Sequence, residues 1–307
     1  MIKKTLYFGN PVYLSLRNHQ LVITTPQQGD ERTAPITRPI EDLGLVVIDN
    51  PQITITSGVL EALSENRTAV LTCNSKRMPH AMLLPMAGNN VQSERYRIQL
   101  EASVVLRKQL WQQTIAAKIA NQSACLQKHT SAETGNMQKW AKSVRSGDPD
   151  NLEARAAVYY WKCLFQDYLP NFVRNQDDDC QPNSLLNYGY AILRSIVARS
   201  LVISGMLPSF GIHHRNRYNA YCLADDIMEP YRPYVDQLVL DIMNRIPASD
   251  TLTLEHKRVL LALPTLDTVI NDLHRPLMIA VGHTTASLYR CFSKEQRKIA
   301  YPDLNLS

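Results

Sequence analysis

Two adjacent histidines and three carboxylates lie close together in the segment 211–230. His213 and His214 follow a glycine, and Asp225, Asp226 and Glu229 come shortly after them. Apolar residues give the second half of the segment a helical rhythm, so carboxylates three or four positions apart share one helix face. Like charges that are so close repel each other unless a cation lies between them or water separates them. One imidazole with carboxylates and water suits a hard divalent ion such as Mg²⁺ or Mn²⁺.

The same residues also have an ordinary structural interpretation. Adjacent histidines occur in polar loops, and acidic residues in the first turn of a helix complement the helix dipole. Asp225 or Asp226 would then be the N-cap of the predicted helix. A metal site requires a further carboxylate from a distant part of the chain.

A candidate for that carboxylate is Glu153, in a helix that we expect to start with Asp148 as N-cap and Pro149 as first residue. Glu153 is in line with Ala157 and Tyr160, so its carboxylate faces apolar and aromatic neighbours. Burying a carboxylate there without a partner is costly. Glu153 is therefore either paired with an arginine, which is the more common arrangement, or bound to a metal.

The first 86 residues have the apolar pattern of β structure. Alternation over residues 12–16, a turn at 18–19 and a returning stretch at 21–25 predict a hairpin. Residues 45–48 are continuously β-branched or apolar, which is typical of a strand covered on both faces. We interpret residues 1–86 as a β-rich N-terminal domain that serves packing or dimerisation.

After residue 86 the apolar period changes from two to about 3.6. The apolar spacing of residues 98–110 predicts one long helix that runs towards Asn121. A second predicted helix, residues 185–201, is apolar on two sides, as expected of a central helix. Gly189 lies within this helix, where glycine costs about 1 kcal/mol relative to alanine, which indicates the close approach of another helix. The sequence therefore predicts an α+β protein in which an all-helical catalytic domain, residues 87–307, follows the β-rich domain.

Composition sets further bounds on the class of protein. The 307 residues are 45% hydrophobic, enough to fill a large core, and the net charge of +5 permits a nucleic-acid partner without requiring one. The longest apolar run is interrupted by Arg194 and Arg199, so we expect no membrane span and no membrane partner. The first residues do not resemble a signal peptide, and the six cysteines form no C-x-x-C pair. We expect a cytoplasmic protein with reduced thiols.

Four segments, taken together and in order, resemble the CRISPR-associated integrase, the first-numbered Cas protein, in the form found in type II systems. They are residues 151–157, 186–190, 211–214 and 223–233. The resemblance spans nearly the whole chain. It implies a β-rich domain joined to a helical catalytic domain, and a homodimer, two of which flank a dimer of the small second-numbered Cas protein. It further implies a double-stranded DNA pre-spacer and CRISPR repeat DNA as partners, together with other type II adaptation proteins.

The resemblance also implies roles for particular residues. Glu153, His214 and Glu229 match the positions of the catalytic metal ligands for Mg²⁺ or Mn²⁺. The doubled histidine leaves His213 as an alternative ligand, although the spacing from the preceding glycine favours His214. Asp226 occupies a position that is acidic in much of the family and is expected to act as an outer ligand.

The reaction implied is metal-dependent endonuclease and transesterase chemistry, in which the 3′-hydroxyl of spacer DNA attacks a phosphodiester of the repeat array. Two other functions remain open at this point, a metal-dependent nuclease of branched DNA and a non-catalytic DNA-binding scaffold. Basic residues beside the ligands and on a short basic helix are candidates to bind DNA phosphates, although the arginines could instead pair with neighbouring carboxylates. These residues are Arg155, Arg215, Arg217, Arg232, Lys139, Lys142 and Arg145.

Overall fold

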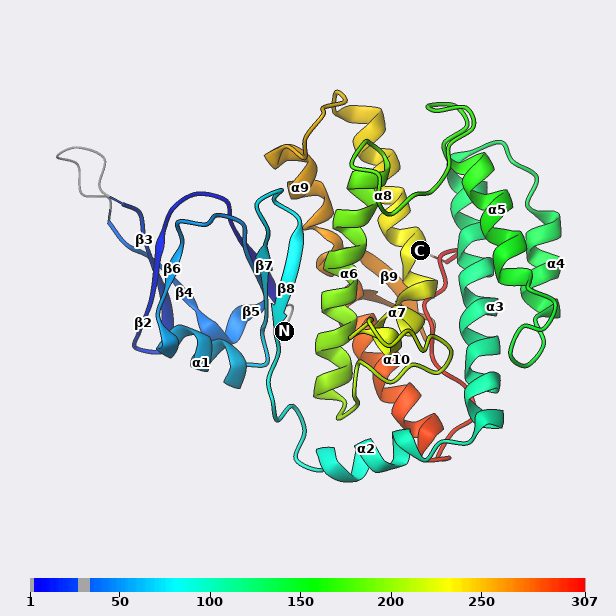
Figure 1. Cartoon of the computed structure of the whole chain (residues 1–307), viewed down its shortest axis with the longest axis horizontal. Helices are drawn as coiled ribbons and strands as arrows, with labels where there is room; N and C mark the ends of the chain where they lie inside the picture. The colour runs from blue at the N-terminus through cyan, green and yellow to red at the C-terminus, as the bar shows by residue number, and fades with distance from the viewer. Residues whose placement is uncertain (1–2, 27–33, 307) are drawn as a thin grey trace. The chain divides into compact units, whose positions relative to one another are not determined.

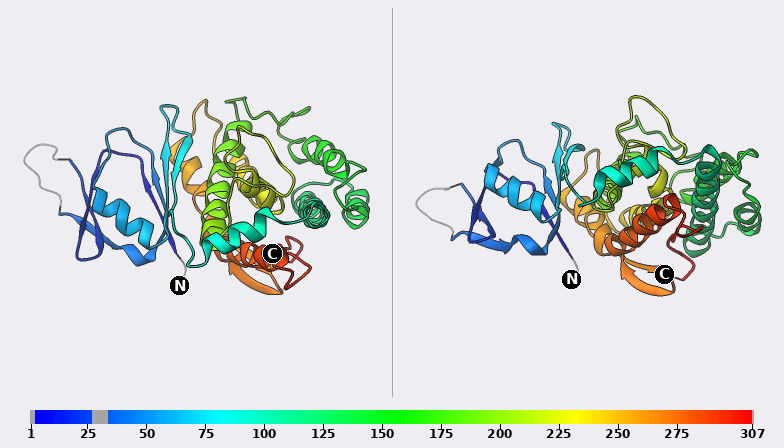
Figure 2. Two further views of the ribbon diagram at one scale, coloured as in Figure 1. Left: turned by 60° about the horizontal axis from the view of Figure 1, so that its bottom comes forward. Right: turned by 90° about the horizontal axis from the view of Figure 1, so that it is seen from below.

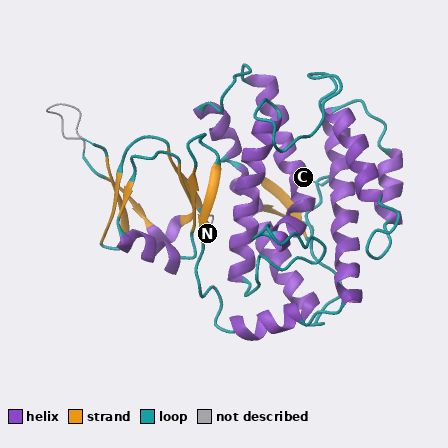
Figure 3. Ribbon diagram, viewed as in Figure 1, coloured by secondary structure: helices purple, strands orange, loops and turns teal. Residues whose placement is uncertain are grey.

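The parts of the chain with different apolar periods form two compact units in the computed structural model, Met1–Gly88 and Asn89–Ser307 (Figure 1). The structure describes residues 3–26 and 34–306. Strands dominate the first unit and helices the second, so the predicted α+β class is confirmed (Figure 3). None of the helices formed by the described residues combines the length and apolarity that a membrane span requires.

The described strands of the first unit form two four-stranded sheets. One has the order β1 (Lys4–Phe8), β5 (Leu43–Ile48), β7 (Ala69–Cys73) and β8 (Pro79–Leu83), and the other has the order β4 (Ile36–Pro39), β3 (Gln20–Thr24), β2 (Tyr13–Arg17) and β6 (Thr54–Ile55). Both sheets and helix α1 (Ser57–Glu65) contribute to one buried cluster, which includes Leu14, Leu21, Val46, Val59 and Val70.

Two predicted features of this unit are present. Strands β2 and β3 form the expected antiparallel hairpin, and its turn residues Asn18 and His19 have φ of 50° and 57°, as a two-residue type I′ turn requires. Strand β5 runs parallel to both β1 and β7, and all of its residues except Ile48 are buried. The continuous apolar run therefore does form a strand covered on both faces.

The second unit is helical and also contains a small hairpin that the sequence pattern did not predict. Helix α6 packs against α7, α8 and α10, while α3 packs against α4, α5 and α8 (Figures 1 and 2). The helices are α2 (Gln92–Leu100), α3 (Val104–His129), α4 (Gly135–Ser143), α5 (Leu152–Leu164), α6 (Asn183–Ile203), α7 (Cys222–Met228), α8 (Arg232–Arg245), α9 (Leu254–Leu260) and α10 (Leu277–Phe292), and the hairpin is β9 (Asp267–Ile270) with β10 (Leu273–Pro276).

Two helix boundaries differ from the prediction. The long helix expected through residue 121 is two helices, because the chain leaves the helix after Leu100 and Ser103 caps α3 by accepting a hydrogen bond from the Leu106 N–H at 3.1 Å. Helix α5 begins at Leu152 with Asn151 as its N-cap, so the prediction of Asp148 as N-cap and Pro149 as first residue is wrong. The carboxylate of Asp148 nevertheless accepts hydrogen bonds from the N–H groups of Leu152 and Glu153 at 3.0 Å each.

Gly189 confirms the predicted close approach of two helices. A Cβ atom at this position would lie 2.4 Å from Val235 Cγ1 of α8 and 3.3 Å from Leu260 Cδ2 of α9. We expect Gly189→Ala to lower the free energy of unfolding by about 2 kcal/mol, because the added methyl overpacks the interface. Denaturant unfolding measures this change. The matched control is Gly282→Ala in α10, where a Cβ meets nothing within 4 Å. A Gly189→Ala protein as stable as that control would contradict the prediction.

A buried aspartate of α8 contacts tyrosines of α5 and α6. Asp236 is 1% exposed and accepts hydrogen bonds from the hydroxyls of Tyr160 at 2.7 Å and Tyr190 at 2.5 Å. Burial raises the pKa of Asp236 from 3.8 to about 6, although the two tyrosine hydrogen bonds oppose the rise. The folded protein therefore binds more protons here than the unfolded chain does between these two pH values.

This shift predicts a stability loss on raising the pH. Each pKa unit corresponds to about 1.36 kcal/mol, so ionisation of Asp236 should lower the free energy of unfolding by about 3 kcal/mol between about pH 4 and pH 6. Other carboxylates act in the opposite direction, so the measurement is the difference between the wild type and Asp236→Asn across this range. A difference that does not vary with pH would contradict the assignment.

Candidate active site

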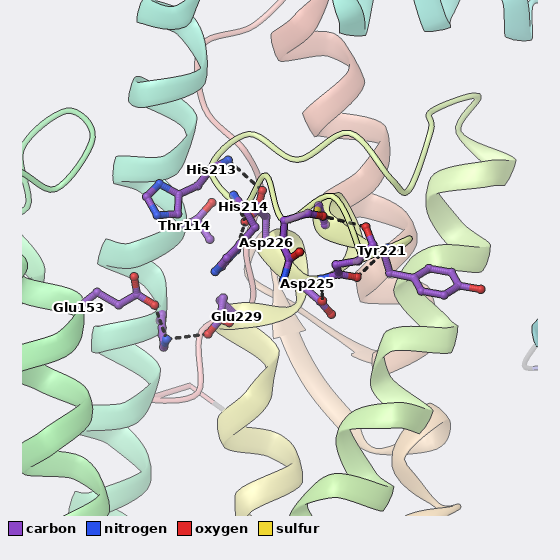
Figure 4. Close-up of polar contacts among 12 residues, drawn as sticks. Thr114, Glu153, His213, His214, Tyr221, Asp225, Asp226 and Glu229 are labelled. Atoms are coloured by element: carbon purple, nitrogen blue, oxygen red, sulfur yellow. Dashed lines mark hydrogen bonds and ion pairs between the residues drawn. The ribbon is translucent and has the colours of Figure 1, made fainter. Parts of the chain in front are cut away.

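The two glutamates predicted as metal ligands meet at one cation. Glu153 lies in the first turn of α5, and Glu229 begins the short 3₁₀ turn that follows α7. Lys118 of α3 places its Nζ 2.7 Å from Glu153 Oε1 and 2.6 Å from Glu229 Oε2 (dashed lines in Figure 4). Its side chain is 11% exposed, against 25% for Glu153 and 5% for Glu229. Glu153 is thus ion-paired as expected, but with a lysine instead of an arginine.

Glu229 has a second cationic neighbour. Arg232 Nε lies 3.0 Å from Glu229 Oε1, and its side chain is 21% exposed. Burial alone would raise the pKa of Glu229, but Arg232 and Lys118 lower it below its ordinary value. Burial would likewise lower the pKa of Lys118, but the charges of Glu229 and Glu153 raise it. Both groups are therefore ionised at neutral pH.

Asp226 positions the second histidine. Its side chain is completely buried, and Oδ1 lies 2.5 Å from His214 Nδ1. The backbone N–H of His213 donates to Oδ2 at 2.9 Å and that of His214 to Oδ1 at 3.3 Å. The ring of His214 points towards Glu229 (Figure 4). The hydrogen bond to Asp226 raises the pKa of His214, burial opposes this, and the charges of Glu229 and Glu153 raise it further.

The two adjacent histidines have different surroundings. His213 stacks on Trp111 of α3, with ring centroids 4.1 Å apart and planes within 3°. Burial and the neighbouring His214 lower the pKa of His213. Its backbone, not its ring, contacts Asp226. The structure therefore places the His214 ring on the side of the carboxylates and the His213 ring against α3.

The prediction that Asp225 or Asp226 is an N-cap is wrong. Helix α7 has Tyr221 at its N-cap, so both aspartates lie inside the helix, and both are buried. Asp225 pairs with Arg194 of α6 at 2.6 Å and accepts a hydrogen bond from the Asn219 side chain at 2.7 Å. The carboxylates of this segment consequently do not share one cation. Asp225 pairs with Arg194, Asp226 accepts hydrogen bonds from the two histidines, and Glu229 pairs with Lys118.

The candidate DNA-binding residues lie in several places. Arg215 and Arg217 line a cavity of about 500 Å³ that also includes His214, and Arg155 is exposed with its guanidinium 5.0 Å from the Trp140 ring centroid. Arg232 lies instead against Glu229, largely covered.

The predicted basic helix face is smaller than expected. Lys139 and Lys142 are in α4, and both are exposed. The helix ends at Ser143, so Arg145 lies beyond it, where both of its guanidinium contacts go to the carboxylate of Asp150, at 2.6 and 2.8 Å. Arg145 is therefore not part of the same helix face.

Lys118 is the site residue that sequence reasoning missed. The buried face of α3 includes Trp111, Ile115, Lys118 and Gln122, which are spaced by three or four residues. A lysine on the buried stripe of a helix requires a charge partner, because an unpaired ammonium there is costly. The place of Lys118 on the apolar stripe of this helix could therefore have indicated a buried ion pair from the sequence.

The donor set at this site fits a hard divalent cation. The carboxylates of Glu153 and Glu229 meet from different elements, and the imidazole of His214 points towards Glu229 (Figure 4). Within residues 3–26 and 34–306, no three His, Cys, Asp or Glu side chains already stand in position to hold a metal ion. Lys118 Nζ instead contacts a carboxylate oxygen of each glutamate, at 2.7 Å for Glu153 and 2.6 Å for Glu229.

The chain is similar to proteins of one family over most of its length. The sequence profile of the family described as CRISPR associated protein Cas1 matches residues 6–275. The CRISPR-associated endonuclease Cas1 of Neisseria meningitidis serogroup C is 38% identical over 248 residues, which cover 79% of this chain and 76% of that protein.

Solved structures share the fold. A casposase bound to integration product aligns with a TM-score of 0.77 and 17% identity, covering 99% of this chain and 93% of that one. A Cas6-RT-Cas1–Cas2 complex contains a chain that aligns with a TM-score of 0.72 and 20% identity, covering 97% of this chain and 36% of that one. The family match over most of the sequence and the close relative together show that the chain belongs to the Cas1 family.

Proposed function

We propose that this protein is a metal-dependent DNA integrase and endonuclease of CRISPR adaptation, which inserts the 3′-hydroxyl ends of spacer DNA into the repeat array. The observation that carries the proposal is the meeting of Glu153 and Glu229 at one cation, with the His214 ring beside them. The relative's description as an endonuclease supports cleavage chemistry, and the fold neighbour bound to an integration product supports strand transfer.

In this proposal Glu153, His214 and Glu229 hold Mg²⁺ or Mn²⁺. When bound, such an ion activates the attacking hydroxyl and stabilises charge on the phosphoryl oxygens. The protein's own residues do the positioning. Asp226 holds the Nδ1–H of His214 and so fixes the ring's orientation and tautomer.

Arg215, Arg217 and Arg155 hold DNA phosphates near the reacting strand in this proposal, because guanidinium groups make bidentate contacts with phosphate oxygens. Lys139 and Lys142 extend the basic surface along α4. No nucleophilic side chain is needed in this proposal, since the 3′-hydroxyl of the DNA is the nucleophile.

The proposed assembly is a homodimer that acts with the small second-numbered Cas protein on a double-stranded pre-spacer and on CRISPR repeat DNA. A fold neighbour is part of a complex described as containing Cas1 and Cas2, which supports this partner. The likeness to the Neisseria relative is consistent with a type II system and its further adaptation proteins.

The test is to incubate the protein with a pre-spacer duplex and a supercoiled repeat plasmid, with and without the second-numbered Cas protein. We expect strand-transfer products that require the divalent ion and disappear with chelator. Cleavage of branched DNA with no strand transfer would instead indicate the nuclease. Salt-sensitive DNA binding that is indifferent to chelator, with neither product, would indicate the scaffold.

Gly211 should be required because it packs against the histidine loop. A Cβ there would lie 2.5 Å from the His214 carbonyl oxygen and 2.6 Å from Asp226 Oδ2. We expect Gly211→Ala to lower strand transfer by about tenfold or more, since displacing Asp226 disturbs the orientation of His214. The matched control is Gly135→Ala, where a Cβ meets nothing within 4 Å. Equal activity of both variants would contradict this role.

A further inference from the structure

Lys118 is a buried cation in contact with both carboxylates of the candidate metal site. Its Nζ lies 2.7 Å from Glu153 Oε1 and 2.6 Å from Glu229 Oε2. Arg232, the second cation beside Glu229, lies 3.0 Å from Oε1 of that residue. A lysine ammonium is a compact point charge on a flexible stem, so it can hold two carboxylates together and still move away from them.

The local charges balance without any further ion. Lys118 and Arg232 carry two positive charges, and Glu153 and Glu229 carry two negative ones. A divalent cation added beside an unmoved ammonium would leave an excess of positive charge in a buried site, where Coulomb repulsion is strong. An ammonium and a divalent ion also compete for the same carboxylate oxygens. The ion and Lys118 Nζ therefore exclude each other from the space between the glutamates.

Resting on the proposed function, we infer that Lys118 is a positioning residue that holds Glu153 and Glu229 together before metal binding and is displaced by the divalent ion. Glu229 is 5% exposed and lies towards the interior, whereas Glu153 is 25% exposed and marks the side that opens to solvent. The displaced side chain moves towards this side. Lys118 thus sets the metal affinity of the site without being a ligand.

The first experiment measures Mn²⁺ binding by calorimetry in the wild type, in Lys118→Met and in Lys162→Met, an exposed lysine of α5 that serves as a matched control. We expect Lys118→Met to bind Mn²⁺ about tenfold or more tightly than the wild type, because the competing cation has been removed. The control should bind as the wild type does. With chelator present, Lys118→Met should melt at a lower temperature than the wild type, since its two carboxylates are then left facing each other.

The second experiment uses the wild type alone, so it stands even if Lys118→Met fails to fold. Amine acetylation is followed by mass spectrometry with chelator and with saturating Mn²⁺. We expect the acetylation rate of Lys118 to rise at least about fivefold with Mn²⁺, the low end of ordinary coupling between two binding events. Lys257, which is 3% exposed in α9, should remain protected in both conditions, and Lys162 should react in both.

The outcomes separate this inference from the proposed function. If Mn²⁺ binds with equal affinity to the wild type and to folded Lys118→Met, and Lys118 labelling does not change, the displacement is wrong while the metal site stands. If neither protein binds Mn²⁺ and strand transfer is absent, the metal site itself is wrong, and the displacement falls with it. Tighter binding by Lys118→Met together with faster labelling in the wild type supports both.

Discussion

Glu153→Gln is expected to lower metal-dependent strand transfer at least about a thousandfold while leaving the fold intact. The amide keeps the shape of the side chain but loses the charge that binds a divalent ion, and a bound ion contributes several kcal/mol to transition-state stabilisation, at about 1.36 kcal/mol per tenfold in rate. In Glu153→Gln, Lys118 keeps its ion pair with Glu229. Because Glu153 is 25% exposed, water can also solvate the ammonium on that side when the charge of Glu153 is lost. The measurement is single-turnover strand transfer, with the melting temperature recorded for the same sample.

Glu229→Gln should lose the same activity but behave differently in stability. Glu229 is 5% exposed and contacts both Lys118 and Arg232, so neutralising it leaves two buried cations without their common partner. Breaking such a buried pair costs about 3–5 kcal/mol. We therefore expect Glu229→Gln to be clearly less stable than Glu153→Gln. Wild-type strand transfer in either variant would mean that the site is misassigned, and equal stability of the two would contradict the burial argument.

Local patterns were sufficient for some of the strands and for several helices. The hairpin of β2 and β3, the buried strand β5 and the close contact at Gly189 each follow from periodicity or from a single residue type. The break between α2 and α3 was not predictable in this way. The residues between them contain neither glycine nor proline, and the helix ends because Ser103 offers its hydroxyl as a new cap.

The site could be predicted in its acidic residues but not in their partners. Spacing placed Asp226 and Glu229 near the histidines, and the apolar surroundings of Glu153 required a partner. The identity of that partner depends on which helices pack together. Lys118 reaches Glu153 across 35 residues of sequence, and Arg194 reaches Asp225 across 31. Long cationic side chains can bridge any two elements that packing brings close, so their pairings require the folded structure.

Asp226→Asn should lower Mn²⁺ affinity and strand transfer by about a hundredfold, the upper range for a residue that orients a metal-binding histidine. Asp226 accepts from His214 Nδ1 at 2.5 Å and from the backbone N–H of His213 at 2.9 Å. An asparagine has only one acceptor oxygen, so it cannot satisfy both groups. The matched control is Asp225→Asn, because Asp225 pairs with Arg194 and contacts neither histidine. It should lose much less Mn²⁺ affinity.

The pH dependence of Mn²⁺ binding distinguishes orientation from simple loss of structure. The hydrogen bond to Asp226 raises the pKa of His214, and a protonated imidazole cannot bind a metal, so wild-type binding should weaken as the pH falls through this raised pKa. Removing the carboxylate removes the cause of the rise. Asp226→Asn should therefore bind Mn²⁺ more weakly than the wild type at every pH. The pH at which its Mn²⁺ binding falls off should nevertheless be lower than in the wild type. If Mn²⁺ binding falls off at the same acidic pH in Asp226→Asn as in the wild type, Asp226 does not act through His214. A general disruption of the site would weaken Mn²⁺ binding without changing the pH at which binding falls off. A shift of that pH is therefore the result that assigns Asp226 its role.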